Sequence, residues 1–273
     1  MTVFILSASA DIGHALAEQY AAAGHTVIGT YRAKSGVASL AGNPNIRLLP
    51  CDVGSRASID AMLREVAALG LQWDLFISAV GTMEPIGSWA ALDFDAWEQS
   101  VTVNSLAQLR VLHGLYRFRR PGAIVHAAFF AGGGTNNPFT NYSAYCVSKI
   151  MLIKMCELID DEVPDVNAFI IGPGFLPTKI HEQTFANPEG AGGNVGKTKQ
   201  FYQQPGAIAT YRDLYDCINW CVAGGREVAG GRNFAAVHDP WKEDGDRLAA
   251  ELRQDRNRYK LRRAGNTGAA ASR

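Results

Sequence analysis

Short, continuously apolar runs alternate with helix-forming stretches along most of the chain, and this alternation limits the fold more than any other feature. Apolar runs of this length, without alternating polar residues, are typical of parallel strands covered by helices on both faces. Right-handed crossovers then place a ligand crevice at the carboxyl ends of the strands. We expect strands at residues 2–7, 25–30, 46–50, 73–78, 122–130 and 166–171, and helices at 12–23, 56–69, 95–118 and 142–160.

The predicted fold class is therefore an α/β Rossmann-type doubly wound parallel sheet. A chain of 273 residues with 47% apolar residues is long enough to build it as a single domain. We expect this domain over residues 1–240, with a substrate lid at 174–210 that is rich in Gly, Asn, Gln and Pro. Residues 241–273 are strongly charged, and we expect a C-terminal extension with a helix near 243–262 and a disordered end.

Charge, cysteine content and the lack of a long apolar segment exclude several classes of function. Twenty-six basic and 26 acidic side chains cancel, so no overall field attracts nucleic acid or an anionic membrane. No apolar run approaches the roughly 20 residues that span a bilayer, and the first residues are typical of a strand rather than a signal peptide. The five cysteines form no C-x-x-C pair, which favours a reduced, cytoplasmic protein. Cys217 and Cys221 lie one helical turn apart, but no further ligand completes a metal site, so we expect core packing and no metal.

The turn after the first expected strand has the composition of a phosphate-binding turn. It contains only small residues and leads into a helix, where free backbone N–H groups and the helix dipole favour a pyrophosphate. Small residues in such a turn can also serve packing alone, and this alternative stays open. The candidate cofactor contacts in this turn are Ser7, Ser9, Asp11, Ile12 and Gly13.

The second expected strand ends at Thr30-Tyr31-Arg32, where a dinucleotide-binding fold places the side chain that recognises the adenosine ribose. An acidic residue there binds a free 2′-hydroxyl, whereas a guanidinium holds a 2′-phosphate through charge-assisted hydrogen bonds. No carboxylate stands at this point, so the sequence favours NADP(H) over NAD(H). Tyr31 and Arg32 are the candidate contacts, and a surface arginine without a role is the alternative.

Tyr145 and Lys149 are the strongest candidates for catalysis. Four residues apart in an expected helix, they lie on one helical face, where the ammonium can lower the pKa of the phenol and make it a usable acid near neutral pH. A Tyr and a Lys four residues apart are common by chance, and it is their position after the fifth expected strand and a Gly-rich loop that favours a catalytic role.

Six motifs follow one another along the chain. They are Ser7-Ala-Ser-Ala-Asp-Ile-Gly13, Cys51-Asp52-Val53, Ser78-Ala79-Val80-Gly81, Val103-Asn104-Ser105, Tyr145-x-x-x-Lys149 and Pro173-Gly174. Their order resembles the short-chain dehydrogenase/reductase family over about residues 2–240. The resemblance implies an NADP(H)-dependent oxidoreductase that works as a homodimer or homotetramer on a small-molecule substrate.

The resemblance also assigns roles to individual residues. Asn104, Tyr145 and Lys149 match three of the four catalytic positions of the family: the tyrosine exchanges the proton, the lysine orients the nicotinamide ribose and lowers the tyrosine pKa, and the asparagine holds a water that relays protons to the lysine. The cofactor contacts that it implies are Asp52, Val53, Ala79, Val80, Gly81, Pro173, Gly174 and Thr178.

Two departures from the family pattern stand out. Ser7 and Asp11 occupy positions where the family motif has glycines, and only Gly13 is retained, which predicts a looser approach of the backbone to the pyrophosphate. The catalytic serine of the family is missing. Counting back from the tyrosine gives Gly132 or Ala131, whereas counting from the start of the strand gives Phe129; none of the three carries a hydroxyl.

Only one loop offers a replacement for the missing serine. Thr135 can donate a hydrogen bond, and the backbone N–H groups of Gly132–Gly134 can form an oxyanion-type cradle. The alternative is that this loop makes room for a bulky substrate.

Other residues lie where they can contact the substrate. Glu84, Lys179 and His181 fall in loops that flank the crevice, whereas His126 lies on a strand and is more typical of a structural histidine. The segments around Thr135, Pro177 and Trp241 resemble a branch of the family found among surface-polysaccharide and nucleotide-sugar genes. This favours a polar substrate that is sugar-like or phosphorylated.

The predicted function is a ketone or aldehyde reductase, or an alcohol dehydrogenase, that uses NADP(H). Two alternatives stay open. One is a non-redox enzyme of the same fold that catalyses isomerisation, dehydration or ring closure, which the missing serine favours. The other is a binding protein that retains the nucleotide, although such a protein would not need Asn104, Tyr145 and Lys149 together.

Overall fold

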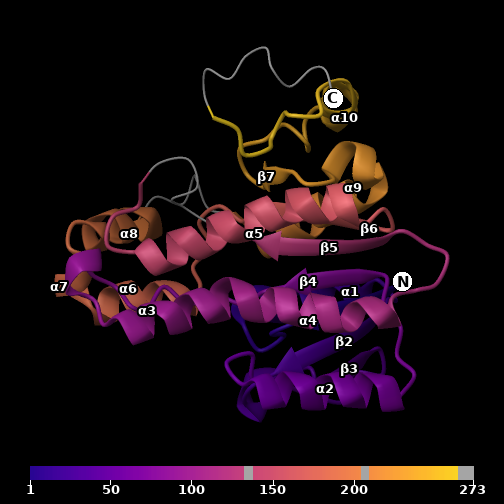
Figure 1. Cartoon of the computed structure of the whole chain (residues 1–273), viewed down its shortest axis with the longest axis horizontal. Coiled ribbons are helices and arrows are strands. Elements are labelled where there is room, and N and C mark those ends of the chain that lie inside the picture. The colour runs from indigo at the N-terminus through magenta and orange to yellow at the C-terminus, as the bar shows by residue number, and fades with distance from the viewer. Residues whose placement is uncertain (132–137, 204–208, 264–273) are drawn as a thin grey trace.

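The computed structural model describes residues 1–131, 138–203 and 209–263, and its centre is a parallel β-sheet (Figure 1). The described strands form one seven-stranded sheet in the order β3-β2-β1-β4-β5-β6-β7, and every pairing is parallel. This confirms the predicted doubly wound fold. The strands are β1 (Thr2–Leu6), β2 (Thr26–Tyr31), β3 (Ile46–Pro50), β4 (Leu75–Ser78), β5 (Val125–Phe130), β6 (Val166–Gly172) and β7 (Asn233–Ala235).

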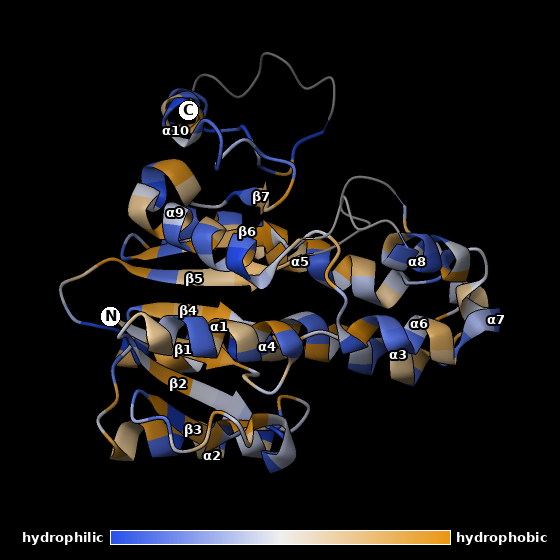
Figure 2. Ribbon diagram, turned by 180° about the vertical axis from the view of Figure 1, so that it is seen from behind, coloured by the Kyte–Doolittle hydropathy of each residue, from blue (hydrophilic) through white to orange (hydrophobic). Residues whose placement is uncertain are grey.

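Helices cover both faces of the sheet (Figures 1 and 2). Helices α1 and α9 pack on one face, and α2, α4 and α5 pack on the other. The α-helices are α1 (Asp11–Ala22), α2 (Arg56–Ala68), α3 (Phe94–Val101), α4 (Ala107–Leu115), α5 (Ser143–Glu162), α6 (Glu182–Ala186), α7 (Pro188–Ala191), α8 (Asn194–Gln203), α9 (Tyr211–Ala229) and α10 (Gly245–Gln254). Short helical turns are η1 (Lys34–Val37), η2 (Trp89–Ala91), η3 (Thr102–Leu106), η4 (Tyr116–Phe118) and η5 (Lys179–His181).

The apolar runs are buried because both faces of each strand meet helices. Along β1, Val3 and Ile5 belong to the core under α1 and α9, whereas Phe4 and Leu6 belong to the core under α2, α4 and α5. Successive side chains of a strand point to opposite faces, so a strand covered on both sides needs apolar residues at every position. On the second face, Phe76 lies 6.1 Å from Phe4 and 5.7 Å from Phe129 between ring centroids.

The sheet order places a crevice beside β1. The chain leaves β1 toward β2 on one side and returns to β4 on the other, and in a doubly wound sheet such a switch point opens a crevice at the carboxyl ends of the strands. Helices α6, α7 and α8 lie beyond this end of the sheet (Figure 1). They belong to the segment predicted as the lid.

Two predicted helices differ from the structure, and one strand was not predicted. The helix predicted at 95–118 is divided into α3, the π-helical turn η3, α4 and the 3-10 turn η4. The helix predicted near 243–262 is shorter, because α10 ends at Gln254 and the chain then returns across β7. Strand β7 was not predicted, since its three residues give too short an apolar run. The predicted disordered end of the chain falls on 264–273, outside the described residues.

The extension beyond residue 240 shares the main core. Leu248 and Leu252 on α10 are buried with Cys217 and Cys221 of α9 in the cluster beneath α1. The two cysteines are thus core residues, and no group of His, Cys, Asp or Glu that could hold a metal ion occurs among the described residues. Within the same part of the chain, no helix is both long and apolar enough to cross a membrane.

Candidate active site

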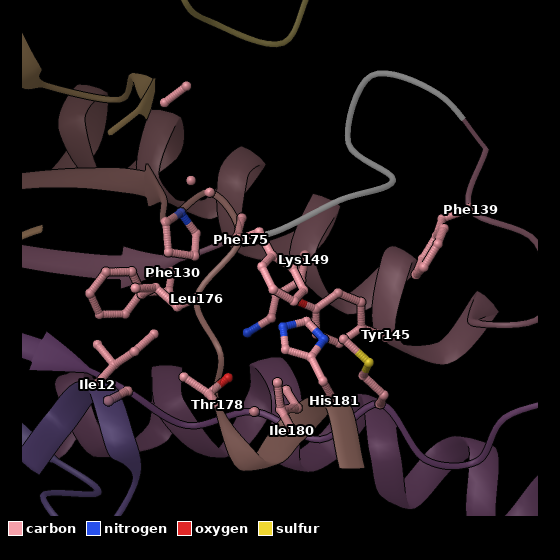
Figure 3. A pocket seen from close by; sticks show the side chains of 18 of the residues that line it. Ile12, Phe130, Phe139, Tyr145, Lys149, Phe175, Leu176, Thr178, Ile180 and His181 are labelled. Carbon is pink, nitrogen blue, oxygen red and sulfur yellow. The ribbon is translucent and has the colours of Figure 1, made fainter. Parts of the chain in front are cut away.

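A large cavity lies at the carboxyl ends of the strands, where the crevice was predicted. Its volume is about 1040 Å³, and its walls come from the start of α1, the segments after β4 and β6, and helices α5, α6 and α8 (Figure 3). A second cavity of about 440 Å³ adjoins it and shares Ser9, Ala79 and Gly81 with it. Together they bring most of the predicted site residues into one continuous space.

The turn after β1 is held tightly against α1. A Cβ atom on Gly13 would lie 2.2 Å from the backbone oxygen of Ser7, so no other residue fits there without movement of the turn. Ser7 itself has a φ of 68°, a conformation that favours glycine. Its N–H donates to the hydroxyl of buried Thr30 at 2.8 Å, which fixes the turn to β2. The turn therefore keeps its shape although a serine replaces the glycine of the family motif.

The start of α1 lies at the wall of the cavity, and no side chain of the described residues caps it. Its N-cap residue is Ala10, whose methyl side chain makes no capping hydrogen bond. The N–H groups of the first turn thus face a space lined by Ser9, Ala10, Asp11 and Ile12. The carboxylate of Asp11 accepts a hydrogen bond from the backbone N–H of Lys179 at 2.7 Å, and its other oxygen lies 3.7 Å from the Lys179 ammonium. Through these contacts the Asp11 carboxylate faces η5 and links η5 to the turn after β1.

The smaller cavity contains the residues predicted to recognise the adenosine end of a dinucleotide. Arg32 is exposed just after β2 and lines this cavity together with Asp52 and Val53. The Asp52 carboxylate accepts from the N–H of Gly54 at 2.9 Å, which shapes the loop before α2. Tyr31 instead packs against the apolar core, so it does not share the position of Arg32.

Tyr145 and Lys149 lie on the first turns of α5 and point into the large cavity (Figure 3). Only 8% of Tyr145 and 3% of Lys149 are exposed. The Lys149 ammonium lies 5.5 Å from the centre of the Tyr145 ring and donates to the backbone oxygen of Val80 at 3.3 Å. Burial lowers the pKa of Lys149 from 10.5 to about 8. The lysine can therefore gain or lose its proton near neutral pH.

Asn104 lies in the π-helical turn and does not reach the cavity wall. Its amide oxygen accepts from the N–H of Thr82 at 2.9 Å, and its amide nitrogen donates to the oxygen of Thr82 and to the hydroxyl of Ser100. The side chain is fully buried and clamps the loop after β4 onto η3. In this arrangement the Asn104 side chain holds the backbone at Thr82.

The structure separates the three positions considered for the missing serine. The side chain of Phe129 is fully buried in the core, which removes it from the site. Ala131 follows β5, lines the large cavity and carries no polar group. Gly132, the glycines after it and Thr135 lie outside the described residues.

The substrate side of the cavity combines aromatic and basic residues. Phe175 stacks between His181 and Phe201, with centroid distances of 4.5 and 4.8 Å. Burial lowers the pKa of His181, which favours the neutral form of its ring. Lys179 and Lys197 also line this cavity, whereas Glu84 lines the smaller one. His126, near the start of β5, contacts the Asn167 amide at 3.0 Å away from both cavities, as expected for a structural histidine.

Several residues at the site were not predicted. Gln183 on α6 accepts from the N–H of Met83 at 2.7 Å and donates to the Thr82 hydroxyl, which attaches α6 to the loop after β4. Tyr259 and Lys260 bring the C-terminal segment to the far wall of the large cavity. Their contacts join segments distant in sequence, so no local pattern indicates them.

A comparison with protein-family models places this arrangement in a family. Residues 1–189, more than half of the chain, match the model described as short chain dehydrogenase. The chain belongs to the short-chain dehydrogenase family. The expected family and its class of chemistry, that of an oxidoreductase, are thereby confirmed.

Among curated members of the short-chain dehydrogenase family, two kinds of reductase are similar to this chain. An NADPH-dependent pterin aldehyde reductase of Arabidopsis thaliana is 27% identical over 216 residues, which are 76% of this chain and 84% of the relative. The 3-oxoacyl-(acyl-carrier-protein) reductase FabG of Escherichia coli is 26% identical over 183 residues, covering 64% and 73% of the two chains.

Solved structures of short-chain dehydrogenases share the fold. One from Streptomyces avermitilis superposes with a TM-score of 0.70 at 25% identity and covers 93% of this chain and 94% of that one. Another, from Shigella flexneri in complex with NADP, gives a TM-score of 0.71 at 18% identity and covers 86% and 96%. The agreement extends over nearly the whole of both folds.

Proposed function

We propose that this short-chain dehydrogenase is an NADP(H)-dependent reductase of ketones or aldehydes. The observation that carries the proposal is the pairing of Tyr145 with buried Lys149 in one cavity, beside an uncapped helix start. The NADPH dependence of the pterin aldehyde reductase supports the choice of cofactor.

The residues present fit a dinucleotide. The first N–H groups of α1 suit the pyrophosphate, because free donors and the helix dipole favour an anion. Arg32 suits a 2′-phosphate, and Asp52 and Val53 suit the adenine beside it. Ala79, Val80 and Gly81 suit the ribose, and Pro173, Gly174 and Thr178 suit the nicotinamide end. When bound, NADPH supplies the hydride.

The chain's own residues then supply the proton and the electrostatics. Tyr145 donates a proton to the carbonyl oxygen as the hydride arrives, which is general acid catalysis. The Lys149 cation stabilises the phenolate that remains, and its ammonium would hold the nicotinamide ribose of a bound cofactor. Asn104 acts through the backbone around Thr82 and Val80 rather than by contact with the substrate.

The lining of the cavity supports a polar, ring-containing substrate. The stack of Phe175, His181 and Phe201 offers a flat apolar wall, and Lys179 and Lys197 offer cations to an anionic group. A phosphorylated or sugar-like carbonyl compound matches both features.

Consumption of NADPH with a panel of aldehydes, ketones and keto sugars tests the proposal. Tyr145→Phe deletes the transferable proton and keeps the ring, so we expect turnover to fall about 10²–10⁴-fold while NADPH binding is nearly unchanged. Retention of more than about a tenth of the rate would remove Tyr145 from the role of acid.

The cofactor preference is tested by titration with NADPH and NADH. We expect tighter binding of NADPH, and Arg32→Ala should erase about 1–3 kcal/mol of that difference. Arg47→Ala is a matched control, because Arg47 is exposed on β3 away from both cavities. Equal affinities of the unmodified protein for the two cofactors would contradict the proposal.

We assign the second hydrogen bond to the substrate oxygen to Thr135 or to the backbone of Gly132–Gly134. Thr135→Val keeps the side-chain shape and deletes the hydroxyl. If Thr135 is the donor, kcat should fall about 10²–10³-fold with KM unchanged. An unchanged kcat would exclude Thr135 and leave the backbone N–H groups or a hydroxyl of the substrate itself as the donor.

A further inference from the structure

A fully buried amide lies beside Lys149, and nothing above gives it a role. Gln108 lies on α4 with 0% of its surface exposed. Its amide oxygen accepts a hydrogen bond from the Ser78 hydroxyl at 2.7 Å. Its amide nitrogen lies 2.7 Å from the backbone oxygen of Asn104, 3.2 Å from that of Val103 and 3.4 Å from that of Val80. The side chain thus joins the end of β4, the π-helical turn and the loop that lines the cavity.

The orientation of this amide follows from its neighbours. The oxygens of Val80, Val103 and Asn104 can only accept, so the donating nitrogen of Gln108 must face them. The oxygen then faces Ser78, whose hydroxyl can donate. A buried polar network in which every member has a partner holds its atoms in one arrangement.

Gln108 and Lys149 meet at the same carbonyl. The Val80 oxygen receives the Lys149 ammonium at 3.3 Å and the Gln108 amide at 3.4 Å. An ammonium with only 3% exposure needs a fixed acceptor, because its hydration has been removed. Val80 lies in the loop directly after β4; the backbone N–H of Ala79 before it still bonds to Leu6 of β1, and side chains hold the loop from Val80 onward. Asn104 holds the neighbouring Thr82, and Gln108 reaches Val80 itself.

We propose that Gln108 is a positioning residue for Lys149. Together with Ser78 it fixes the Val80 carbonyl on which the ammonium rests, and it thereby aims the lysine at the cofactor ribose. Gln108 touches neither cofactor nor substrate in this arrangement and acts only through Lys149. The inference rests on the proposed role of Lys149 in holding the nicotinamide end of NADPH.

A double-mutant cycle on NADPH binding tests this, with fluorescence titration as the readout, so no substrate is needed. Gln108→Met keeps the length of the side chain and deletes both hydrogen-bonding groups. We expect it to raise the Kd for NADPH about threefold to tenfold, as loss of one buried hydrogen bond would. In a Lys149→Met background the same substitution should change the Kd less than about twofold.

Additive effects of the two substitutions on the Kd would overturn the proposal, since Gln108 would then act independently of Lys149. Lack of any effect of Lys149→Met would instead reject the proposed role of the lysine, so the two failures are distinguishable. Gln19→Met is the matched control: Gln19 lies on α1, and its buried amide oxygen has no hydrogen-bond partner among the described residues. It should leave the Kd unchanged.

If Gln108→Met does not fold, Ser78→Ala decides the question. It keeps the amide of Gln108 and deletes only the hydroxyl that holds its oxygen. We expect a smaller rise in the Kd for NADPH that disappears in the Lys149→Met background. No rise in the Kd, or a rise that persists in that background, would overturn the proposal.

Discussion

Lys149 is the residue at which stability and the proposed chemistry conflict. Its ammonium is almost entirely buried, and burial lowers its pKa to about 8. In the unfolded chain the same group has its ordinary pKa of 10.5. Between these two values the unfolded state binds more protons than the folded state, so stability rises with pH across this window. Below about pH 8 the cost of burying the charge is present in full.

We therefore expect Lys149→Met to stabilise the free protein at pH 7 while it impairs NADPH binding. The gain in free energy of unfolding should be on the order of 3 kcal/mol, from the difference between the two pKa values. It should shrink as the pH rises from 8 toward 10.5, because the folded wild-type protein then no longer has to bury a charged lysine. Urea unfolding of both proteins across this pH range measures the difference. A gain that does not change with pH would show that the charge is not its source.

Ser7 carries backbone strain where the family motif has glycine. With a φ of 68° it adopts a left-handed conformation that costs a residue with a Cβ roughly 1–2 kcal/mol. We expect Ser7→Gly to raise the free energy of unfolding, because glycine adopts this conformation without strain. The gain should be at most about 1 kcal/mol, because glycine also loses more conformational entropy on folding than serine does. Ser7→Val should lower it instead, because a β-branched side chain disfavours this conformation further. Thermal unfolding compares the two variants, and a stabilised valine variant would contradict the argument.

At the scale of elements, α1 can pack against the turn before it only because Gly13 has a hydrogen atom where other residues have a Cβ. Gly13→Ala would drive a Cβ into the backbone oxygen of Ser7, which cannot move as a flexible side chain could. We expect loss of NADPH binding together with destabilisation of at least about 1–3 kcal/mol. Gly196→Ala on α8 is the control, because its new Cβ meets nothing within 4 Å and alanine favours a helix. Calorimetry and NADPH titration of both variants provide the comparison.

Most of the strands could be predicted from the sequence, whereas the interruption of one helix could not. Apolar runs predicted six strands and their parallel pairing, because a strand buried on both faces leaves that pattern in its composition. The helix at 95–118 was predicted as one piece, since a single π-helical turn at Thr102–Leu106 barely disturbs the apolar spacing on either side.

Some residues of the candidate site could likewise be predicted from the sequence, and others could not. Tyr145 and Lys149 lie four residues apart on one helix, so their meeting could be predicted from spacing. The role of Gln108 could not, because two of its partners, Ser78 and Val80, lie on β4 and in the loop after it, about 30 positions earlier in the chain.

At the scale of the whole molecule, Arg232 fastens the C-terminal segment to the domain. Its buried guanidinium donates to five backbone oxygens, in the last turns of α9, at the end of α10 and in the segment after it. Arg232→Met would leave these acceptors without their donor. We expect the free energy of unfolding to fall by about 3 kcal/mol or more, with the segment that lines the cavity loosened. Arg253→Met, at an exposed ion pair with Glu227, should change stability by less than about 0.5 kcal/mol.

Hydrogen exchange of the segment around Tyr259 would detect the loosening directly. If Arg232→Met has the free energy of unfolding of the wild type and its C-terminal segment exchanges as slowly, Arg232 does not hold this segment on the domain.

The path of that segment also determines how the sheet ends. The outward N–H of Asn233 on β7 donates to the oxygen of Tyr259, and the outward N–H of Ala235 donates to the Asp239 carboxylate. A free strand edge is a template for another chain, and here its donors are already engaged. At the opposite edge, β3 carries exposed Arg47 and ends at Pro50, which has no N–H to offer. Removal of the segment after residue 240 by proteolysis would therefore free the Asn233 N–H at this edge, and we expect it to increase strand-to-strand aggregation.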